Sequence, residues 1–393
     1  MESAMPWQEV DTVDLRREFV QLSRVGTLNL SELCRRFKIS RKTGYKWLRR
    51  YEKEGDKGLY DRSCCPHHQP RRSSVELEQA VLEVRQRFPE WGGRKLARVM
   101  RNEGQLKIPS PSTITQILRR HGQLHPPGEP VPANYIRFEH PHPNDLWQMD
   151  FKGDFPLMRG RCHPLTVLDD HSRFSVCLAA CDNERSETVK VQLIQVFEHY
   201  GLPKRMTMDN GSPWGGSGSS FTQLTVWLIE NGVRVSHSRP YHPQTQGKDE
   251  RFHRTLNAEL IGRRTFAGLR EVQNAFGPWR HRYNTQRPHE ALNMDTPIEH
   301  YQPSSQVYRP ALAAYEYAPG DYVRKVSPNL ECAFKNYRIF IGQAFRGKYI
   351  ALRPTINDGV YTMHFCHQWI GQIDLNTMTK RNGKRAKKLY TDA

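Results

Sequence analysis

Three acidic residues from well-separated segments carry the clearest chemical signal in this sequence. Asp150 lies in Leu-Trp-Gln-Met-Asp-Phe, Asp209 opens Asp-Asn-Gly-Ser-Pro-Trp, and Glu250 lies in the cation-rich stretch Gly-Lys-Asp-Glu-Arg-Phe-His-Arg. Hard divalent cations prefer oxygen ligands. Two Mg²⁺ ions about 3.5–4 Å apart can serve the attacking and leaving oxygens of a phosphodiester displacement. We therefore expect a site that holds divalent metal against nucleic-acid phosphate.

The helical phase of the segment around Glu250 supports a role at a cleft. At about 100° per residue, Arg254 and Asn257 lie within about 40° of Glu250 on one helix face. Phe252 and Leu256 fall about 200–240° round the helix, where they can pack inward. Glu250 is therefore expected to face the cleft.

Neighbouring charges in the same helix are given other roles. Glu259 lies about 180° from Glu250, on the wrong face. Asp249 lies about 100° away and is expected to be solvated. Lys248, Arg251 and Arg254 are expected to flank the cleft as clamps on DNA phosphates.

Other acids compete for the first two places in the site. Asp169 and Asp170 end a predicted strand, where capping of a turn with Ser172 and Arg173 is the favoured interpretation and metal ligation the alternative. Asp154 is two pleats from Asp150 and can share its face, but it lies at the far end of the strand.

The elements that must position these acids follow a recognisable order. Strand-like segments at 147–155, 163–170 and 174–180 predict a three-strand meander. A helix over 186–200, a strand over 204–209, a helix over 221–230, a strand over 233–237, a long helix from about 245 or 246 and a helix over 269–283 are expected to follow. This is the ribonuclease-H-like order, and it predicts an α/β catalytic core over 146–300.

The first part of the chain predicts a helix-turn-helix domain over 10–55. Three short helices are expected between 14 and 51, with Asn29 and Glu32 at capping-box spacing and Ser40 as an N-cap. The third would place its first residues where base edges are met. The candidate DNA-binding residues are Arg41, Lys42, Thr43, Tyr45, Lys46 and Arg49. A basic three-helix module that reads no groove is the alternative.

Two linkers flank a second helical region. Residues 56–74 contain Cys64, Cys65, His67 and His68, but adjacent pairs do not match the spacing of structural zinc sites, so we expect a linker and no zinc. Residues 75–124 predict a second helix-turn-helix-like domain, and the proline-rich residues 125–145 predict another linker.

The end of the chain changes to short strands. Residues 308–376 predict a small SH3-like β-barrel, and residues 377–393 form a basic tail that either seeks phosphate or is a solvated end. The expected fold class is therefore multidomain α+β: N-terminal helix-turn-helix units, a ribonuclease-H-like core and a C-terminal barrel.

The amino-acid composition narrows the kinds of molecule that the chain is expected to bind. A net charge of +18 and a pI of about 9.6 favour polyanions through phosphate neutralisation, although a basic ribosome-like or merely soluble protein is also compatible. Neither a membrane-spanning run nor a secretory signal is seen. The eight cysteines form no CxxC pair. We expect reduced thiols in a cytosolic protein.

Several motifs together resemble bacterial insertion-sequence transposases with a retroviral-integrase-type DDE core. The matching segments are Trp-Gln-Met-Asp at 147–150, Val-Leu-Asp-Asp-His-Ser-Arg at 167–173, Asp-Asn-Gly-Ser-Pro-Trp at 209–214, residues 239–256, and Tyr-Asn-Thr-Gln-Arg-Pro-His-Glu-Ala-Leu at 283–292 with Thr-Pro behind it.

This resemblance implies that Asp150, Asp209 and Glu250 form a catalytic triad with two Mg²⁺ or Mn²⁺ ions, Asp150 bridging the metals. It implies cleavage at element ends to expose 3′-hydroxyls that attack target DNA, without a covalent enzyme intermediate or an organic cofactor. The helix-turn-helix units would bind terminal inverted repeats, and a homodimer or higher oligomer would pair two ends.

Two features depart from the family. Forty residues separate Asp209 from Glu250, more than the family commonly has, and a Gly/Ser-rich insertion at 215–220 accounts for the excess. The zinc-binding N-terminal module of retroviral integrases has no counterpart. A ribonuclease-H-type metal-dependent nuclease and a catalytically inactive transposase-derived DNA-binding regulator are the alternative functions.

Overall fold

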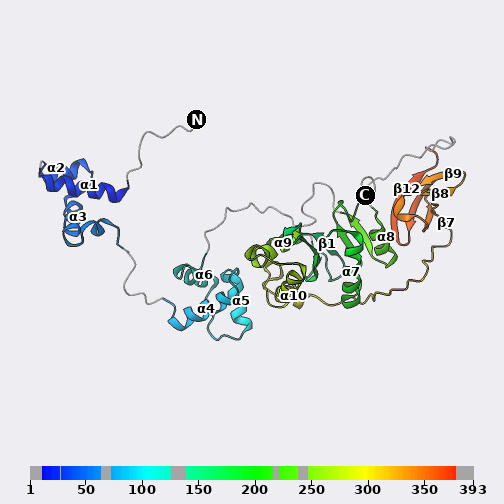
Figure 1. The fold of residues 1–393 in the computed structure, drawn as a ribbon, viewed down its shortest axis with the longest axis horizontal. Helices are drawn as coiled ribbons and strands as arrows, with labels where there is room; N and C mark the ends of the chain where they lie inside the picture. The colour runs from blue at the N-terminus through cyan, green and yellow to red at the C-terminus, as the bar shows by residue number, and fades with distance from the viewer. Residues whose placement is uncertain are drawn as a thin grey trace. The chain divides into compact units, whose positions relative to one another are not determined.

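The computed structural model describes residues 11–26, 28–62, 72–124, 139–215, 221–237 and 247–377 (Figure 1). The chain divides into two compact units, Met1–Ser73 and Ser74–Ala393. The Cys64, Cys65, His67 and His68 segment, the Gly/Ser-rich residues 216–220 and the basic tail from residue 378 onward lie outside the described residues.

The first unit contains the three predicted helices. They are α1 (Thr12–Val25), α2 (Leu30–Arg36) and α3 (Arg41–Glu54), followed by the 3₁₀ turn η1 (Gly55–Leu59). Buried Phe19, Leu33 and Trp47 join them in one small core. Ser40 caps α3 as predicted, because its Oγ accepts a hydrogen bond from the Thr43 backbone N–H at 3.1 Å.

The capping box predicted at the start of α2 is wrong. Asn29 does cap the helix, since its Oδ1 accepts from the Ser31 N–H at 2.7 Å. Glu32 does not return to the Asn29 N–H; its carboxylate pairs instead with Arg35 at 3.1 Å. Arg35 lies three residues from Glu32 on the same helix face, where opposite charges attract.

The second unit begins with another three-helix group. It consists of α4 (Val75–Arg87), α5 (Gly93–Asn102) and α6 (Pro111–Arg120). Ser74 and Ser110 cap α4 and α6 through backbone amides of the first turn. Val81, Leu96 and Ile117 are fully buried where the helices meet, so the predicted helical region has its own core.

The central sheet has the predicted strand order. Its strands are β1 (Trp147–Phe151), β2 (Phe155–Pro156), β3 (Arg161–Asp169), β4 (Ser175–Cys181), β5 (Arg205–Met208) and β6 (Arg234–His237). β3 pairs antiparallel with both β1 and β4, which confirms the meander, and β1–β5 and β5–β6 pair in parallel. This is the ribonuclease-H-like arrangement.

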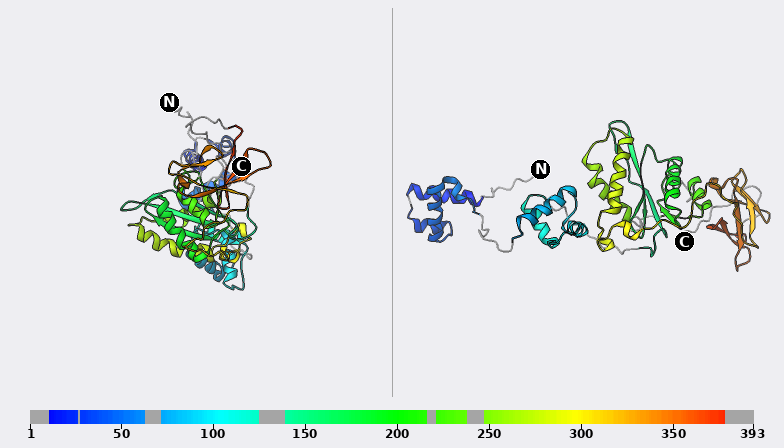
Figure 2. Two further views of the ribbon diagram at one scale, coloured as in Figure 1. Left: turned by 90° about the vertical axis from the view of Figure 1, so that its right-hand side faces the viewer. Right: turned by 90° about the horizontal axis from the view of Figure 1, so that it is seen from below.

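Helices cover both faces of this sheet. They are α7 (Ser186–Tyr200), α8 (Gln223–Glu230), α9 (Gly247–Glu259) and α10 (Leu269–Thr285). Successive strand residues point to opposite faces: Val167 packs with α7 and α8, whereas Leu168 packs with α9 and α10. Figures 1 and 2 show the sheet between these two helix pairs. Short 3₁₀ turns follow at η3 (Ile261–Arg263), η4 (Glu290–Leu292) and η5 (Pro297–His300).

The C-terminal strands form two separate hydrogen-bonded groups. They are β7 (Tyr322–Lys325), β8 (Glu331–Phe334), β9 (Tyr337–Phe340), β10 (Tyr349–Pro354), β11 (Val360–Phe365) and β12 (Gln368–Asp374), with η6 (Gln343–Phe345) between β9 and β10. They form a four-stranded sheet, β12-β11-β10-β7, and a separate β8–β9 hairpin. Within the described residues the hydrogen bonds do not close a barrel, so the SH3-like barrel remains a prediction.

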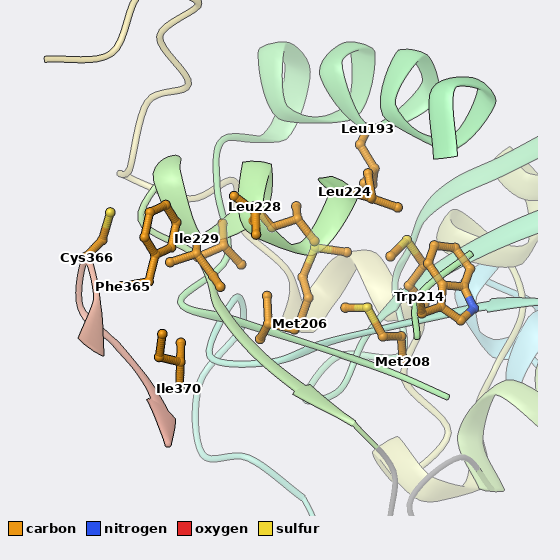
Figure 3. Close-up of a cluster of buried hydrophobic side chains, with 14 of the residues drawn as sticks. Leu193, Met206, Met208, Trp214, Leu224, Leu228, Ile229, Phe365, Cys366 and Ile370 are labelled. Carbon is orange, nitrogen blue, oxygen red and sulfur yellow. The ribbon is translucent and has the colours of Figure 1, made fainter. Parts of the chain in front are cut away.

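The hydrophobic core of the central sheet continues into these strands. Ile229 of α8 belongs to the same buried cluster as Phe365 and Ile370 (Figure 3). The Gln368 carboxamide accepts a hydrogen bond from the Val235 N–H at 3.1 Å and donates one to the Val235 carbonyl at 3.3 Å. Because β6 is an edge strand, Gln368 satisfies backbone groups that its own sheet leaves unpaired.

Two expectations on composition can be compared with the structure. Cys34, Cys162, Cys177, Cys181, Cys332 and Cys366 are free and buried, as predicted for reduced thiols. No helix within the described ranges is long and apolar enough to cross a membrane.

The close crossing of α5 and α6 gives a first testable expectation. A Cβ added to Gly93 would lie 2.3 Å from the Pro111 carbonyl oxygen, whereas nothing lies within 4 Å of one added to Gly92. Gly93→Ala should therefore destabilise the α4–α6 group by about 1–3 kcal/mol through overpacking. Amide hydrogen exchange of α5 and α6 in the full chain measures the effect.

Gly92→Ser is the matched control, because Gly92 is the N-cap of α5 and serine is a favoured residue there. It should leave protection of α5 unchanged or raise it. Equal losses in the two variants would contradict the role assigned to the close contact at Gly93.

Candidate active site

Asp150 faces helix α9. In the β1–β3 ladder Asp150 lies opposite Thr166, and directly opposed residues project to the same side of a sheet. The Thr166 hydroxyl donates to the Asp150 carbonyl at 3.0 Å and lies 2.8 Å from Nε2 of His253 on α9. Burial, then the charge of Lys152, lowers the pKa of His253 to about 4, so this imidazole is neutral at pH 7.

Asp209 comes to the same end of the sheet. In the parallel β1–β5 ladder Gln148 lies beside Thr207, and the same register two residues on brings Asp209 beside Asp150. The Asp209 carboxylate accepts from the Gly211 N–H at 3.1 Å, and its carbonyl lies 2.8 Å from Nδ1 of His237. The structure therefore brings together the first two predicted acids.

The pKa values of Asp150 and Asp209 are both raised. Burial, followed by the negative charge of Asp209, raises the pKa of Asp150 to about 7, with smaller contributions from Glu184 and Glu250. Burial also raises the pKa of Asp209, to which Glu184 adds. Like charges held close together disfavour ionisation, so this end of the sheet is poised to accept a cation.

Glu184 is a nearby acid that was not predicted. It follows β4, just before α7, and its Oε1 lies 2.9 Å from Nδ1 of His163. Its position depends on the β3–β4 pairing, where His163 lies opposite Cys181. One sequence signal could have identified Glu184. It follows β4 closely; β4 pairs with β3, and β3 pairs with β1, which carries Asp150.

Helix α9 has the rotation predicted from its sequence. Phe252 and Leu256 are 1% and 0% exposed and pack against the sheet and α10, whereas Glu250 is exposed. Glu250 also contributes to the raised pKa of Asp150. Its role as third acid of the site remains a prediction.

The expectation that Asp249 is solvated is wrong. Asp249 is 0% exposed, and neither carboxylate oxygen has a hydrogen-bond partner among the described residues. Burial first, and then the charges of Asp150 and Asp170, raise its pKa well above the usual range. The physical reason is the helical repeat: Asp249, Phe252 and Leu256 are spaced i, i+3 and i+7 and form one buried stripe.

Asp169 holds the turn after β3, as predicted. Its carboxylate accepts from the Asn144 N–H at 2.7 Å, from the Ser172 N–H at 2.8 Å and from the Ser172 hydroxyl at 2.6 Å. All these donors belong to the turn or to the segment before β1. Asp169 thus has a structural role, and the alternative of metal ligation is not needed to explain it.

Asp170 anchors the beginning of α9 through an ion pair with Lys248. The Asp170 carboxylate accepts from the His140 N–H at 2.9 Å and from Gln148 Nε2 at 2.8 Å. It also forms an ion pair with Lys248, whose Nζ donates to the Asp170 carbonyl at 3.0 Å. Lys248 therefore holds α9 against the turn after β3, and its role as a clamp on DNA phosphate remains a prediction.

Two other acids, Asp154 and Glu259, have partners away from the proposed metal site. Asp154 pairs with Arg161 at the far end of β1 and β3. Glu259 accepts hydrogen bonds from the indole N–H groups of Trp91 at 3.0 Å and Trp279 at 3.1 Å, and from Arg287 at 3.1 Å. Its assignment to the wrong face of the helix is confirmed.

The remaining predicted DNA-binding residues are accessible. Arg251 and Arg254 on α9 are exposed. On α3, Arg41, Lys42, Tyr45, Lys46 and Arg49 are exposed, and Thr43 bonds through its hydroxyl to Ser40 at 2.9 Å. The spacing i, i+4 and i+8 places Arg41, Tyr45 and Arg49 along one stripe, so they can meet one partner together.

The donor set fits a hard divalent cation. Across the described ranges, no three His, Cys, Asp or Glu residues already lie close enough to hold a metal ion. The acids of this site nevertheless supply only carboxylate oxygens, which suit Mg²⁺ and Mn²⁺. The orphaned carboxylate of Asp249 and the raised pKa of Asp150 both mark a site short of positive charge.

Known domain families match the chain in order. Homeodomain-like domains match residues 11–60 and 43–118. The Integrase core domain matches residues 140–243 and, through a second family, residues 231–297. The C-terminal domain of the IS481 family transposases matches residues 321–381.

Related proteins include two from insertion elements. The IS476 uncharacterized 39.2 kDa protein of Xanthomonas euvesicatoria is 28% identical over 158 residues, covering 40% of this chain and 44% of that protein. The IS407 uncharacterized 31.7 kDa protein of Burkholderia multivorans is 28% identical over 157 residues, covering 40% and 55%. The chain thus spans about half the length of each. The Pro-Pol polyprotein of simian foamy virus type 3 is 31% identical over 135 residues, covering 33% and 11%.

Two solved structures are also similar. A simian T-cell lymphotropic virus intasome in complex with PP2A regulatory subunit B56 gamma shares 16% identity over 74% of this chain and 95% of that one, with a TM-score of 0.38. An HTLV-2 integrase catalytic core domain in complex with magnesium shares 15% identity over 41% and 99%, with a TM-score of 0.33. Both TM-scores are low. The description of the fold therefore rests on the family matches and on the strand order.

The ion pair between Lys248 and Asp170 gives a second testable expectation. Lys248→Met leaves a buried carboxylate without its cation, which should cost about 3 kcal/mol at pH 7. Burial opposes ionisation of Asp170, but Lys248 and the hydrogen bonds outweigh it, so the pKa of Asp170 is lowered in the fold. A carboxyl group whose pKa is lowered by folding stabilises the fold at pH values above its pKa in the unfolded chain. That stability is lost as the pH falls through its pKa in the folded protein.

Chemical denaturation of wild type and Lys248→Met at pH 7 and at pH values below about 4 measures this difference in unfolding free energy. It should shrink as the pH falls. Arg251→Met is the matched control, because Arg251 is exposed one turn later on α9, and it should change stability little. A Lys248 effect that does not vary with pH would contradict the ion-pair assignment.

Proposed function

We propose that this chain, which resembles insertion-sequence transposases with an integrase-type core, is a Mg²⁺- or Mn²⁺-dependent DNA transposase. It would bind the terminal inverted repeats of a mobile element, cleave at the element ends to expose 3′-hydroxyls and join these to target DNA. The observation that carries the proposal is the convergence of Asp150 and Asp209 on neighbouring strands, facing the helix that bears Glu250.

In this proposal Asp150, Asp209 and Glu250 would hold two divalent cations. When bound, such ions activate an attacking oxygen and stabilise a leaving oxygen. Strands β1 and β5 fix the first two acids in register, and the apolar stripe of α9 fixes the rotation of the third. Exposed Arg251 and Arg254 on α9 would bind the phosphates that flank the reacting bond.

Recognition of the element ends is assigned to the N-terminal helices. The exposed residues of α3 form a basic surface with one aromatic residue, Tyr45, which is 52% exposed, and an exposed helix face of this composition can enter a major groove. The α4–α6 group would add a second contact along the end. Pairing of two element ends would require a homodimer or higher oligomer. Cleavage and joining of the DNA would take place in the cytoplasm.

The catalytic assignment is tested with purified protein, end DNA and target DNA in Mg²⁺ or Mn²⁺. Asp150→Asn, Asp209→Asn and Glu250→Gln should each abolish strand transfer while leaving end binding largely intact, because each removes a metal ligand and no DNA contact. Gel analysis of cleaved and joined products distinguishes transfer from simple hydrolysis.

Asp154→Asn is the matched control, since Asp154 lies near Asp150 but pairs with Arg161, and it should retain transfer. A triad variant that still joined ends would overturn the assignment. Wild-type protein that cut DNA without joining it would favour a nuclease.

Recognition is tested separately. Arg41→Ala or Lys46→Ala should weaken binding to the element ends more than binding to random duplex, by about 1–3 kcal/mol if a bidentate base contact is lost. Lys53→Ala, exposed at the far end of α3, should lower both affinities equally or not at all. Equal losses for Arg41→Ala on specific and random DNA would reduce α3 to a phosphate contact.

A further inference from the structure

The proposed active site contains a buried acid that the three-carboxylate scheme does not use. Asp249 precedes Glu250 in the first turn of α9 and is 0% exposed. Both of its carboxylate oxygens are buried and lack a hydrogen-bond partner among the described residues. Buried polar groups almost always have partners, so an orphaned carboxyl at this position requires an explanation.

Among the described residues, no neighbouring side chain supplies the missing partner. The adjacent cation, Lys248, forms an ion pair with Asp170 and also donates to the Asp170 carbonyl at 3.0 Å. The other residues of the buried stripe, Phe252 and Leu256, are apolar. The charges that act on Asp249 most strongly are those of Asp150 and Asp170, both negative.

This arrangement is costly in the absence of a cation. An unpaired buried carboxyl loses its hydration without compensation, and the nearby carboxylates repel it. Apolar side chains elsewhere on the stripe avoid that cost. A divalent cation held at Asp150 would reverse the sign of the local charge and stabilise Asp249 in place.

We propose that Asp249 is a positioning residue of the metal site: its carboxyl group lies on the buried face of α9, which packs on β1, strengthens cation binding at Asp150, and couples occupation of the site to docking of the first turn of α9. Because Glu250 is the next residue, cation binding would also fix the position of this third acid. This inference rests on the proposed function and extends it to a fourth carboxylate.

The test compares metal-free and metal-bound protein, with stability and binding as readouts that do not require catalysis. Thermal unfolding of the full chain is measured in EDTA and across a range of Mg²⁺ and Mn²⁺ concentrations, together with Mn²⁺ binding by calorimetry. Asp249→Asn, which keeps the shape and removes the charge, is the main variant. Asp249→Leu removes the polar group altogether.

Without metal, both variants should keep at least the Tm of wild type, and Asp249→Leu should exceed it, because the unpaired buried carboxyl group is gone. Their Tm should rise less on adding Mg²⁺ or Mn²⁺. Affinity for Mn²⁺ should fall about 10–100-fold, as for other residues that support metal ligands without being ligands. Glu198→Gln, which removes one exposed carboxylate from α7, controls for overall charge and should change neither quantity.

The outcomes separate this inference from the function beneath it. If Asp150→Asn abolishes Mn²⁺ binding but both Asp249 variants bind as wild type does, the role of Asp249 is overturned and the proposed metal site stands. If neither Asp150→Asn nor Asp249→Asn alters binding, the proposed site itself fails. Equal loss of Tm with and without metal in both Asp249 variants would make Asp249 a purely structural residue and overturn the inference.

Discussion

The site depends on the packing of α9 across the central sheet. Phe252 and Leu256 insert between the sheet and α10, and because a helix is rigid this contact fixes which residues of its first turn face β1 and β5. The burial of two large apolar side chains, each contributing about 1.5–3 kcal/mol, opposes the repulsion among acids that the same packing brings together. The fold thereby holds like charges closer than they would lie in solution.

The polar contacts around this helix complete its attachment. At its start, Lys248 is bound to Asp170, and at its end Glu259 accepts hydrogen bonds from Trp279 and Arg287. Between these two anchors the exposed face keeps Glu250, Arg251 and Arg254 accessible. One helix thus separates the groups that maintain the fold from those assigned to metal and DNA.

Local sequence patterns predicted the elements well, since strand and helix periodicities are properties of short segments. The helix over 186–200, for example, has its predicted bounds. The same reasoning failed for Asp249 because its angle was measured only from Glu250; measured from Phe252 and Leu256, it falls on the buried stripe.

Other features depend on contacts that no local pattern contains. Lys248 reaches an aspartate seventy-eight residues away in sequence, and Glu184 approaches the site only because β4 pairs beside β3. Closure of the C-terminal strands is likewise a matter of long-range hydrogen bonding. Sequence periodicity predicts strands there but does not choose between a barrel and a sheet with a hairpin.

The proposed function requires that β1, β5 and α9 hold a divalent cation against DNA. Anomalous scattering from Mn²⁺ in crystals of the protein with end DNA tests it most directly. The account predicts a Mn²⁺ peak about 2 Å from carboxylate oxygens of Asp150 and Asp209, with Glu250 at the same site. Bound DNA with Mn²⁺ located away from these residues, or with none near Asp150, would contradict it.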